Sequence, residues 1–160
     1  YCLLRQELEQ ILTNGTDEEK EILALTLAAL KRRKEKGSAY INEFLGLEGS
    51  FQAEDTYQLV VPITPFMMNS LNIVHGGITA TLADCTMGTL IKKSLPSGND
   101  VVTAELKVNY IAPGKGKKLI STAKLLSRGK HLCVAECKIE NETGRLIAAA
   151  TGTFFIIHHR

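Results

Sequence analysis

A single acidic side chain stands in the middle of a long stretch of uncharged residues. Between Thr56 and Ile91 the chain has 36 residues and one formal charge, which belongs to Asp84. At the overall charged content of 22%, a stretch of this length would hold about eight charged residues. A carboxylate without a nearby cation is costly in apolar surroundings, so Asp84 is a candidate general base or nucleophile. The alternative is a structural aspartate that is bonded to backbone or hydroxyl donors, or one at an exposed helix tip.

The tripeptide His75-Gly76-Gly77 stands at the predicted start of the helix that carries Asp84. A helix N-terminus presents unpaired N–H groups and a positive potential, and glycine lets a substrate approach the backbone closely. These groups could polarise a carbonyl, as an oxyanion hole does. The alternative is an ordinary loop in which the histidine caps the helix.

One long helix and a series of strands must position these residues. Apolar and small residues predict a helix over 76–93 that is buried along most of its length. One strand is predicted from near Phe51 to about Pro62, and four further strands are predicted at 101–111, 117–127, 131–140 and 145–157. The spacers between the later strands have hairpin lengths, so we predict an antiparallel sheet and the α+β class.

The predicted strand at 101–111 alternates between two faces. The apolar set is Val102, Ala104, Leu106, Val108 and Tyr110, and the polar set is Thr103, Glu105, Lys107 and Asn109. An alternating pattern is typical of a strand with one face packed on the core.

The N-terminal part of the chain has the pattern of a helical extension. Residues 1–14 fit one helical stripe, and a capping box at Thr16–Glu19 begins a second helix that ends at Gly37. We therefore predict an extension over 1–37 and a main domain over 38–160. The basic run at 31–36 complements the helix dipole, and binding of phosphate or RNA is the alternative.

The composition disfavours several classes of protein. The net charge of +2 is small for a nucleic-acid binder, and no run of 18 apolar residues predicts a membrane span. The four cysteines have neither zinc-site spacing nor any need to form disulfides in a chain of this length. We expect reduced thiols, no metal, no nucleic-acid or membrane partner, and a cytoplasmic location.

The spacing Asn69-x5-His75-Gly76-Gly77-x6-Asp84 resembles the hot-dog-fold acyl-CoA thioesterases of the PaaI-like, phenylacetate-pathway branch. The stretch from Thr103 to Gly114 and the turn Arg128-Gly129-Lys130 are also similar to that family. The resemblance covers about Tyr40 to Ile157. It implies an antiparallel sheet wrapped around one long central helix, and hydrolysis of acyl-CoA to a free acid and CoA without a cofactor.

The resemblance also implies roles for individual residues. Asp84 matches the general base or nucleophile, and the Gly76 N–H matches the group that polarises the thioester carbonyl. His75 matches a residue that shapes this loop, and Asn69 one that holds the attacking water or the carbonyl. Thr103 matches a hydroxyl that assists the carboxylate.

The resemblance further implies an assembly and a CoA site. In the family, Asn69, His75 and Gly76 come from one subunit of a dimer, and Asp84 and Thr103 from the other. Two such dimers commonly form a homotetramer. Gly77 belongs to the substrate-binding glycine pair. Arg128 and Lys130 match positions that contact the CoA phosphates, and exposed hairpin charges are the alternative. Relatives often have glycine where this chain has Asn72, a residue that tolerates left-handed backbone geometry.

Two other functions are compatible with the pattern. A non-catalytic acyl-CoA-binding regulator would use the N-terminal helices to contact DNA or a protein. A hot-dog dehydratase or hydratase would act on the acyl chain instead of the thioester. A cysteine nucleophile at Cys85 is disfavoured because no histidine lies within helical reach.

Overall fold

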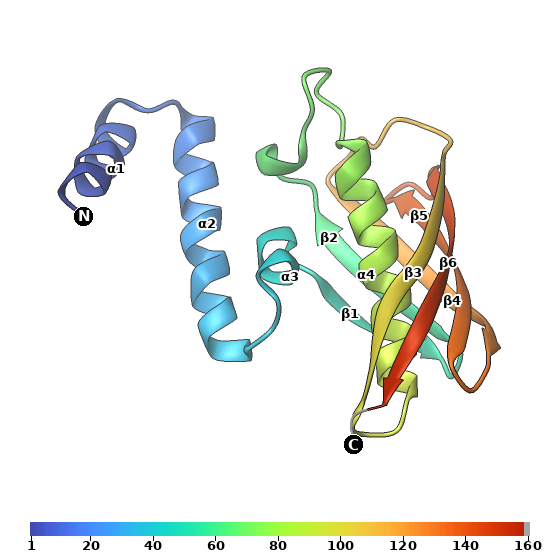
Figure 1. The fold of residues 1–160 in the computed structure, drawn as a ribbon. Helices are drawn as coiled ribbons and strands as arrows, with labels where there is room; N and C mark the ends of the chain where they lie inside the picture. The colour runs from blue at the N-terminus through green and yellow to red at the C-terminus, as the bar shows by residue number, and fades with distance from the viewer. Residues whose placement is uncertain (159–160) are drawn as a thin grey trace. The chain divides into compact units, whose positions relative to one another are not determined.

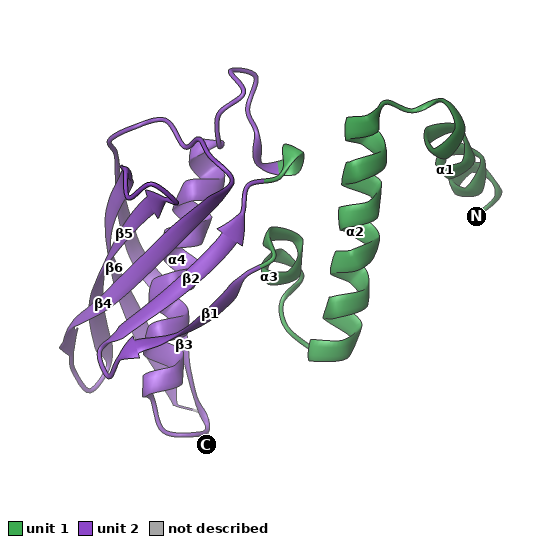
Figure 2. Ribbon diagram, turned by 180° about the vertical axis from the view of Figure 1, so that it is seen from behind, with its two compact units in different colours: residues 1–46, 64–66 green, residues 47–63, 67–160 purple. Residues whose placement is uncertain are grey.

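The computed structural model describes residues 1–158 and divides into two compact units (Figure 2). The larger unit, residues 47–63 and from Met67 onward, is a six-stranded antiparallel sheet packed against helix α4 (Gly76–Ser94) (Figure 1). Its strands are β1 (Glu48–Ala53), β2 (Thr56–Pro62), β3 (Asn99–Tyr110), β4 (Lys118–Arg128), β5 (Leu132–Asn141) and β6 (Leu146–His158), in the order β1-β2-β4-β5-β6-β3. The predicted α+β class, with an antiparallel sheet around a long helix, is confirmed. The prediction of one strand from near Phe51 to Pro62 is wrong, because a tight turn at residues 54–55 divides this segment into the antiparallel pair β1 and β2.

Helix α4 has one face in the core. Its buried side chains recur at helical spacing and are Thr79, Leu82, Ala83, Thr86, Met87, Leu90 and Ile91. The Thr86 hydroxyl is satisfied inside the core, since it donates to the Leu82 carbonyl and lies 2.6 Å from the Ser121 hydroxyl. The side of α4 that carries Asp84 and Cys85 is only half-buried in the single chain. The predicted burial therefore holds for one face of the helix.

A β-bulge interrupts the register between β3 and β6. Thr103 pairs with Phe154 and Glu105 pairs with Thr153, so Ala104 has no partner across the ladder. Because a bulge inserts one residue, it exchanges the two faces of the strand beyond it. Thr103 consequently faces α4, as buried Phe154 does, while Val102 is 49% exposed. The predicted alternation, which placed Thr103 on the polar face and Val102 with Leu106, is wrong on the N-terminal side of the bulge.

Strand β3 is an edge of the sheet. It pairs with β6 on one side and with no strand of residues 1–158 on the other. An unpaired edge offers free N–H and C=O groups to another strand. At its two ends β3 also exposes the large side chains of Val102 and Tyr110.

The smaller unit, residues 1–46 and 64–66, contains helices α1 (Cys2–Asn14), α2 (Asp17–Lys36) and α3 (Tyr40–Leu45). The predicted capping box is confirmed, because the Glu19 N–H donates to the Thr16 hydroxyl while the Thr16 N–H donates to the Glu19 carboxylate. Gly37 ends α2 with a φ of 69°, as predicted for a left-handed cap. The division of the chain at residue 37 stays a prediction. No helix of residues 1–158 is long and apolar enough to cross a membrane.

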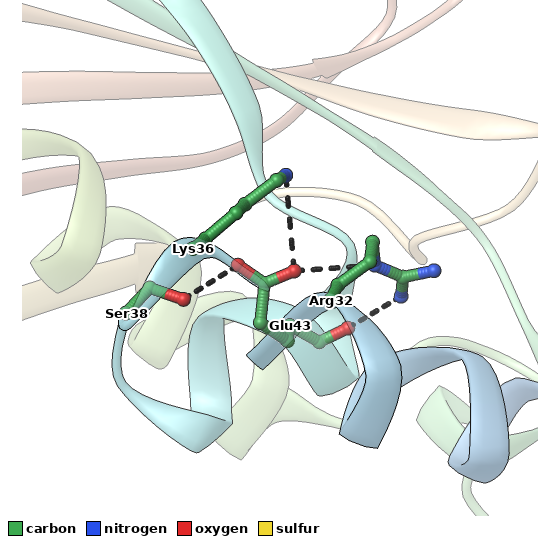
Figure 3. A network of polar contacts seen from close by, with 4 residues as sticks. All are labelled: Arg32, Lys36, Ser38 and Glu43. Carbon is green, nitrogen blue, oxygen red and sulfur yellow. Dashed lines mark hydrogen bonds and ion pairs between the residues drawn. The ribbon is translucent and has the colours of Figure 1, made fainter. Parts of the chain in front are cut away.

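A buried carboxylate joins α2 to α3 (Figure 3). Glu43 is 4% exposed and accepts from the Ser38 hydroxyl at 2.6 Å and from Arg32 Nε at 3.1 Å, with Lys36 Nζ at 3.8 Å. Arg32 also donates to the Glu43 main-chain carbonyl at 2.8 Å. The Ser38 hydrogen bond, helped by Lys36 and Arg32 and opposed by burial, holds the pKa of Glu43 below its ordinary value of 4.5.

We expect Glu43→Gln to lower the free energy of local opening at the junction between α2 and α3 by about 1–3 kcal/mol. The reason is that Arg32 and Lys36 lose the carboxylate with which they pair. Since the folded-state pKa of Glu43 is lowered, the stability that its carboxylate contributes is complete above about pH 4.5. This stability is lost as the pH falls through the folded-state pKa. Hydrogen exchange of the α2 amides measures the local opening. Glu35→Gln, at an exposed position of the same helix, is the control. Equal exchange in both variants would contradict the prediction.

Candidate active site

The loop before α4 is shaped by Asn69. The Asn69 side-chain oxygen accepts from the backbone N–H groups of Leu71 at 2.9 Å and Ile73 at 3.3 Å. These two donors identify that atom as the oxygen, so the side-chain NH₂ is free to donate; it has no acceptor within residues 1–158. Asn69 was predicted to hold water or the carbonyl, and its amide NH₂ is the group available to do so.

Asn72 has a left-handed backbone, with a φ of 56°. The position where relatives often have glycine therefore does require this geometry, and asparagine is one of the few other residues that adopt it readily. The departure from the family pattern leaves the turn intact.

His75 is the N-cap of α4. The ring nitrogen Nδ1 of His75 accepts from the Gly77 N–H at 2.9 Å, and the backbone N–H of His75 donates to the Met67 carbonyl at 2.8 Å. Because Nδ1 is an acceptor, the proton of the neutral ring is on Nε2. His75 can therefore cap the helix with one nitrogen and donate a hydrogen bond with the other.

Gly76 is left with the free N–H group at the helix start. The next three N–H groups, of Gly77, Ile78 and Thr79, all donate to atoms of His75, whereas the Gly76 N–H has no acceptor within residues 1–158. Gly76 and Asn69 line one cavity of about 320 Å³. The predicted carbonyl-polarising group is therefore available, while Gly77 completes the cap.

The Asp84 side chain on α4 is oriented by Thr103, which lies on β3. The Thr103 hydroxyl donates to Asp84 Oδ1 at 2.7 Å, and both residues line a second cavity of about 300 Å³. Asp84 Oδ2 has no partner in the described chain, so one carboxylate oxygen is oriented and the other is free to accept a proton. Neighbouring Cys85 is a poor nucleophile, because burial, with a smaller effect of Asp84, raises its pKa to about 11.

Within one chain, the Gly76 N–H and the Asp84 carboxylate lie apart. Gly76 and Asp84 are eight residues apart on one α-helix, which corresponds to about 12 Å along the axis. Gly76 and Asp84 also line separate cavities, which have no lining residue in common. Within one chain the two groups therefore do not face a shared cavity. The structure brings Asn69, His75 and Gly76 together, and separately brings Asp84 and Thr103 together.

The two predicted CoA-binding cations lie at the far end of α4. Arg128 donates to the carbonyl of Ser94, the last residue of α4, and borders a cavity of about 920 Å³ together with Lys93. Lys130 is exposed in the turn between β4 and β5. A cation at a helix C-terminus is favourable in itself, so the contact to Ser94 accounts for part of the placement of Arg128.

Sequence reasoning assigned no role to two residues at this site. The Tyr110 hydroxyl donates to the Gly76 carbonyl at 2.9 Å. The Gly114 carbonyl accepts from the Val74 N–H at 2.9 Å, and a Cβ on Gly114 would lie 2.9 Å from that of Val74. Both residues belong to the stretch that resembles the family, which was the only available signal. No group of His, Cys, Asp or Glu able to hold a metal ion occurs in residues 1–158.

Known proteins share both this fold and this sequence pattern. Residues 71–148 match the Thioesterase superfamily. A Bacillus halodurans protein, whose crystal structure was determined with CoA, is 35% identical and superposes with a TM-score of 0.87 over 93% of this chain and 99% of its own. The chain belongs to the thioesterase superfamily. The predicted resemblance to hot-dog thioesterases and the predicted enzyme class, thioester hydrolase, are confirmed.

Two proteins of Escherichia coli show how far this similarity extends. The Escherichia coli medium/long-chain acyl-CoA thioesterase YigI is 28% identical over 72% of this chain and 84% of its own length. The E. coli PaaI protein of the phenylacetic acid degradation operon is 21% identical, with a TM-score of 0.69 over 83% of this chain and 96% of its own. The second similarity shows a shared fold.

Proposed function

We propose that the protein is an acyl-CoA thioesterase in which Asp84 activates the attack and the Gly76 N–H polarises the thioester carbonyl. The observation that carries the proposal is a pair of groups on α4. One is the free Gly76 N–H at its start, and the other is the Asp84 carboxylate two turns later, of which Thr103 binds one oxygen and leaves the other free. The similarity to the acyl-CoA thioesterase YigI and to the Bacillus halodurans protein, whose structure was determined with CoA, supports acyl-CoA as the substrate.

The reaction needs only groups that this chain provides. Water attacks the thioester carbon while Asp84 takes a proton from it, and the negative charge on the carbonyl oxygen is met by the Gly76 N–H. The C–S bond then breaks, and the proton held by Asp84 passes to the leaving thiolate of CoA, which restores the Asp84 carboxylate. Direct attack by Asp84 would instead form an anhydride that water hydrolyses. His75 Nε2 and the Asn69 amide are the further donors near the carbonyl.

The proposed site requires two chains. The separate cavities of Gly76 and Asp84 in one chain support a site shared between two chains, and β3, which carries Thr103, is an edge strand that pairs only with β6 among residues 1–158. A homodimer formed along β3 gives each site Gly76 of one subunit and Asp84 of the other. Two such dimers form the proposed homotetramer.

The remaining features of the proposal concern the rest of the substrate and the compartment. Arg128 and Lys130 contact the phosphates of CoA, which lie at the far end of its long pantetheine arm.

The four cysteines are free thiols, which supports a reducing compartment and hence the cytoplasm. No cofactor takes part.

The proposal is tested by release of free thiol from a panel of medium-chain, long-chain and aromatic acyl-CoA substrates. We expect hydrolysis of at least one class. Tight binding of acyl-CoA without thiol release would contradict the proposal in favour of a regulator. Addition of water to enoyl-CoA without thiol release would contradict it in favour of a hydratase.

A further inference from the structure

Tyr110, the last residue of β3, contacts the first residue of α4. Its hydroxyl donates to the Gly76 carbonyl at 2.9 Å, and two of its ring carbons lie 3.4 Å from the place that a Cβ on Gly76 would occupy. Tyr110 lines the same cavity as Gly76 and Asn69. Tyr110 thus binds Gly76 through its carbonyl and leaves the Gly76 N–H free.

The backbone groups around Gly76 are all fixed except this one. The carbonyl of His75, which shares a peptide unit with the Gly76 N–H, accepts from the N–H groups of Ile78 and Thr79, and the carbonyl of Gly76 accepts from the Tyr110 hydroxyl. Gly76 and Gly77 begin α4 and have no side chains to restrict their backbone, so its geometry depends on these bonds. The direction of the Gly76 N–H is therefore set by bonds on both sides of it.

The exposure of Tyr110 indicates what its hydroxyl is for. The side chain is 58% exposed, so it contributes little core packing, and its hydroxyl could bond to water instead. It bonds the backbone at the helix start. We propose that Tyr110 is a positioning residue of the thioesterase site, whose hydroxyl anchors the Gly76 carbonyl and so fixes the backbone of Gly76 with its N–H directed at the thioester carbonyl. This inference rests on the proposed function of Gly76.

The kinetic test replaces Tyr110 with phenylalanine, which deletes one oxygen and keeps the ring. We expect kcat for a hydrolysed acyl-CoA to fall about tenfold, while KM stays within about twofold, because the bond acts on the geometry of the transition state. The pH profile and the Tm should stay as in the wild type, since Asp84 and the core are untouched. Tyr40→Phe deletes a phenol oxygen from an equally exposed tyrosine outside the site, 58% exposed, and should change nothing.

A second measurement does not depend on catalysis. In the full chain, the backbone order parameter of the Gly76 amide is measured by NMR for the wild type, Tyr110→Phe and Tyr40→Phe. We expect it to fall from about 0.85 toward 0.6 only in Tyr110→Phe. An unchanged order parameter, or an unchanged kcat in an active enzyme, would overturn the inference. A wild type that hydrolyses no thioester refutes the proposed function, and the NMR comparison still decides whether Tyr110 orders Gly76.

Discussion

Asp84→Asn is expected to lower the rate of thioester hydrolysis by at least about 10². The substitution keeps the size of the side chain and an oxygen that accepts the Thr103 hydrogen bond, but it removes the free carboxylate oxygen that takes the proton. KM should change little, since the amide occupies the same place. Thiol release under saturating acyl-CoA is the measurement, with Asp84→Ala as the variant that also removes the Thr103 contact.

Glu48→Gln is the matched control for Asp84→Asn. Glu48 begins β1, at the other edge of the sheet from β3, where it pairs with Val60 and is exposed. Its neutralisation changes the net charge by the same amount and leaves the site intact. If both variants hydrolyse acyl-CoA at the wild-type rate, Asp84 is the structural aspartate that its hydroxyl contact also allows.

Gly76→Pro is expected to reduce kcat by about 10²–10³, which is the loss seen when one oxyanion donor is removed. The proline has no N–H, and it suits this position for two reasons. Gly76 is the first residue of α4, where proline is favoured, and His75 before it has a φ of −59° and a ψ of 137°, the extended geometry that a residue before proline prefers. The variant should therefore keep its helix and lose only the donor.

Gly76→Ala separates the donor from the effect of added bulk. Its methyl group would lie 3.4 Å from the Tyr110 ring, an ordinary contact, and its N–H is retained. We expect the alanine variant to stay within about tenfold of the wild type, with circular dichroism and Tm confirming that both variants fold. Equal kcat values for the proline and alanine variants would contradict the role of the Gly76 N–H.

The main elements of the fold could be predicted because their signals are local. The capping box at Thr16, the glycine that ends α2 and the short hairpin spacers depend on neighbouring residues, and the uncharged stretch around Asp84 marked the central helix. Asp84 itself stood out because a charge in such a stretch is rare. These inferences required no knowledge of tertiary contacts.

The geometry of the site depends on contacts between distant segments, which the sequence pattern does not reveal. Strict alternation placed Thr103 on the wrong face, because a bulge at Ala104 leaves no local signature in this strand. The contact of Tyr110 with Gly76 joins residues 34 positions apart, so only the fold shows it. Likewise, Asp84 is only half-buried in one chain, and the sequence pattern does not show which groups would cover it.

The central claim is that each site combines Gly76 of one subunit with Asp84 of the other. Co-expression of Asp84→Asn chains with Gly76→Pro chains tests it directly, because each variant alone is nearly inactive. In a mixed dimer one site receives both intact residues and the other receives neither. Statistical pairing then predicts about a quarter of the wild-type kcat per chain. Activity no higher than that of the separate variants would contradict a site shared between subunits.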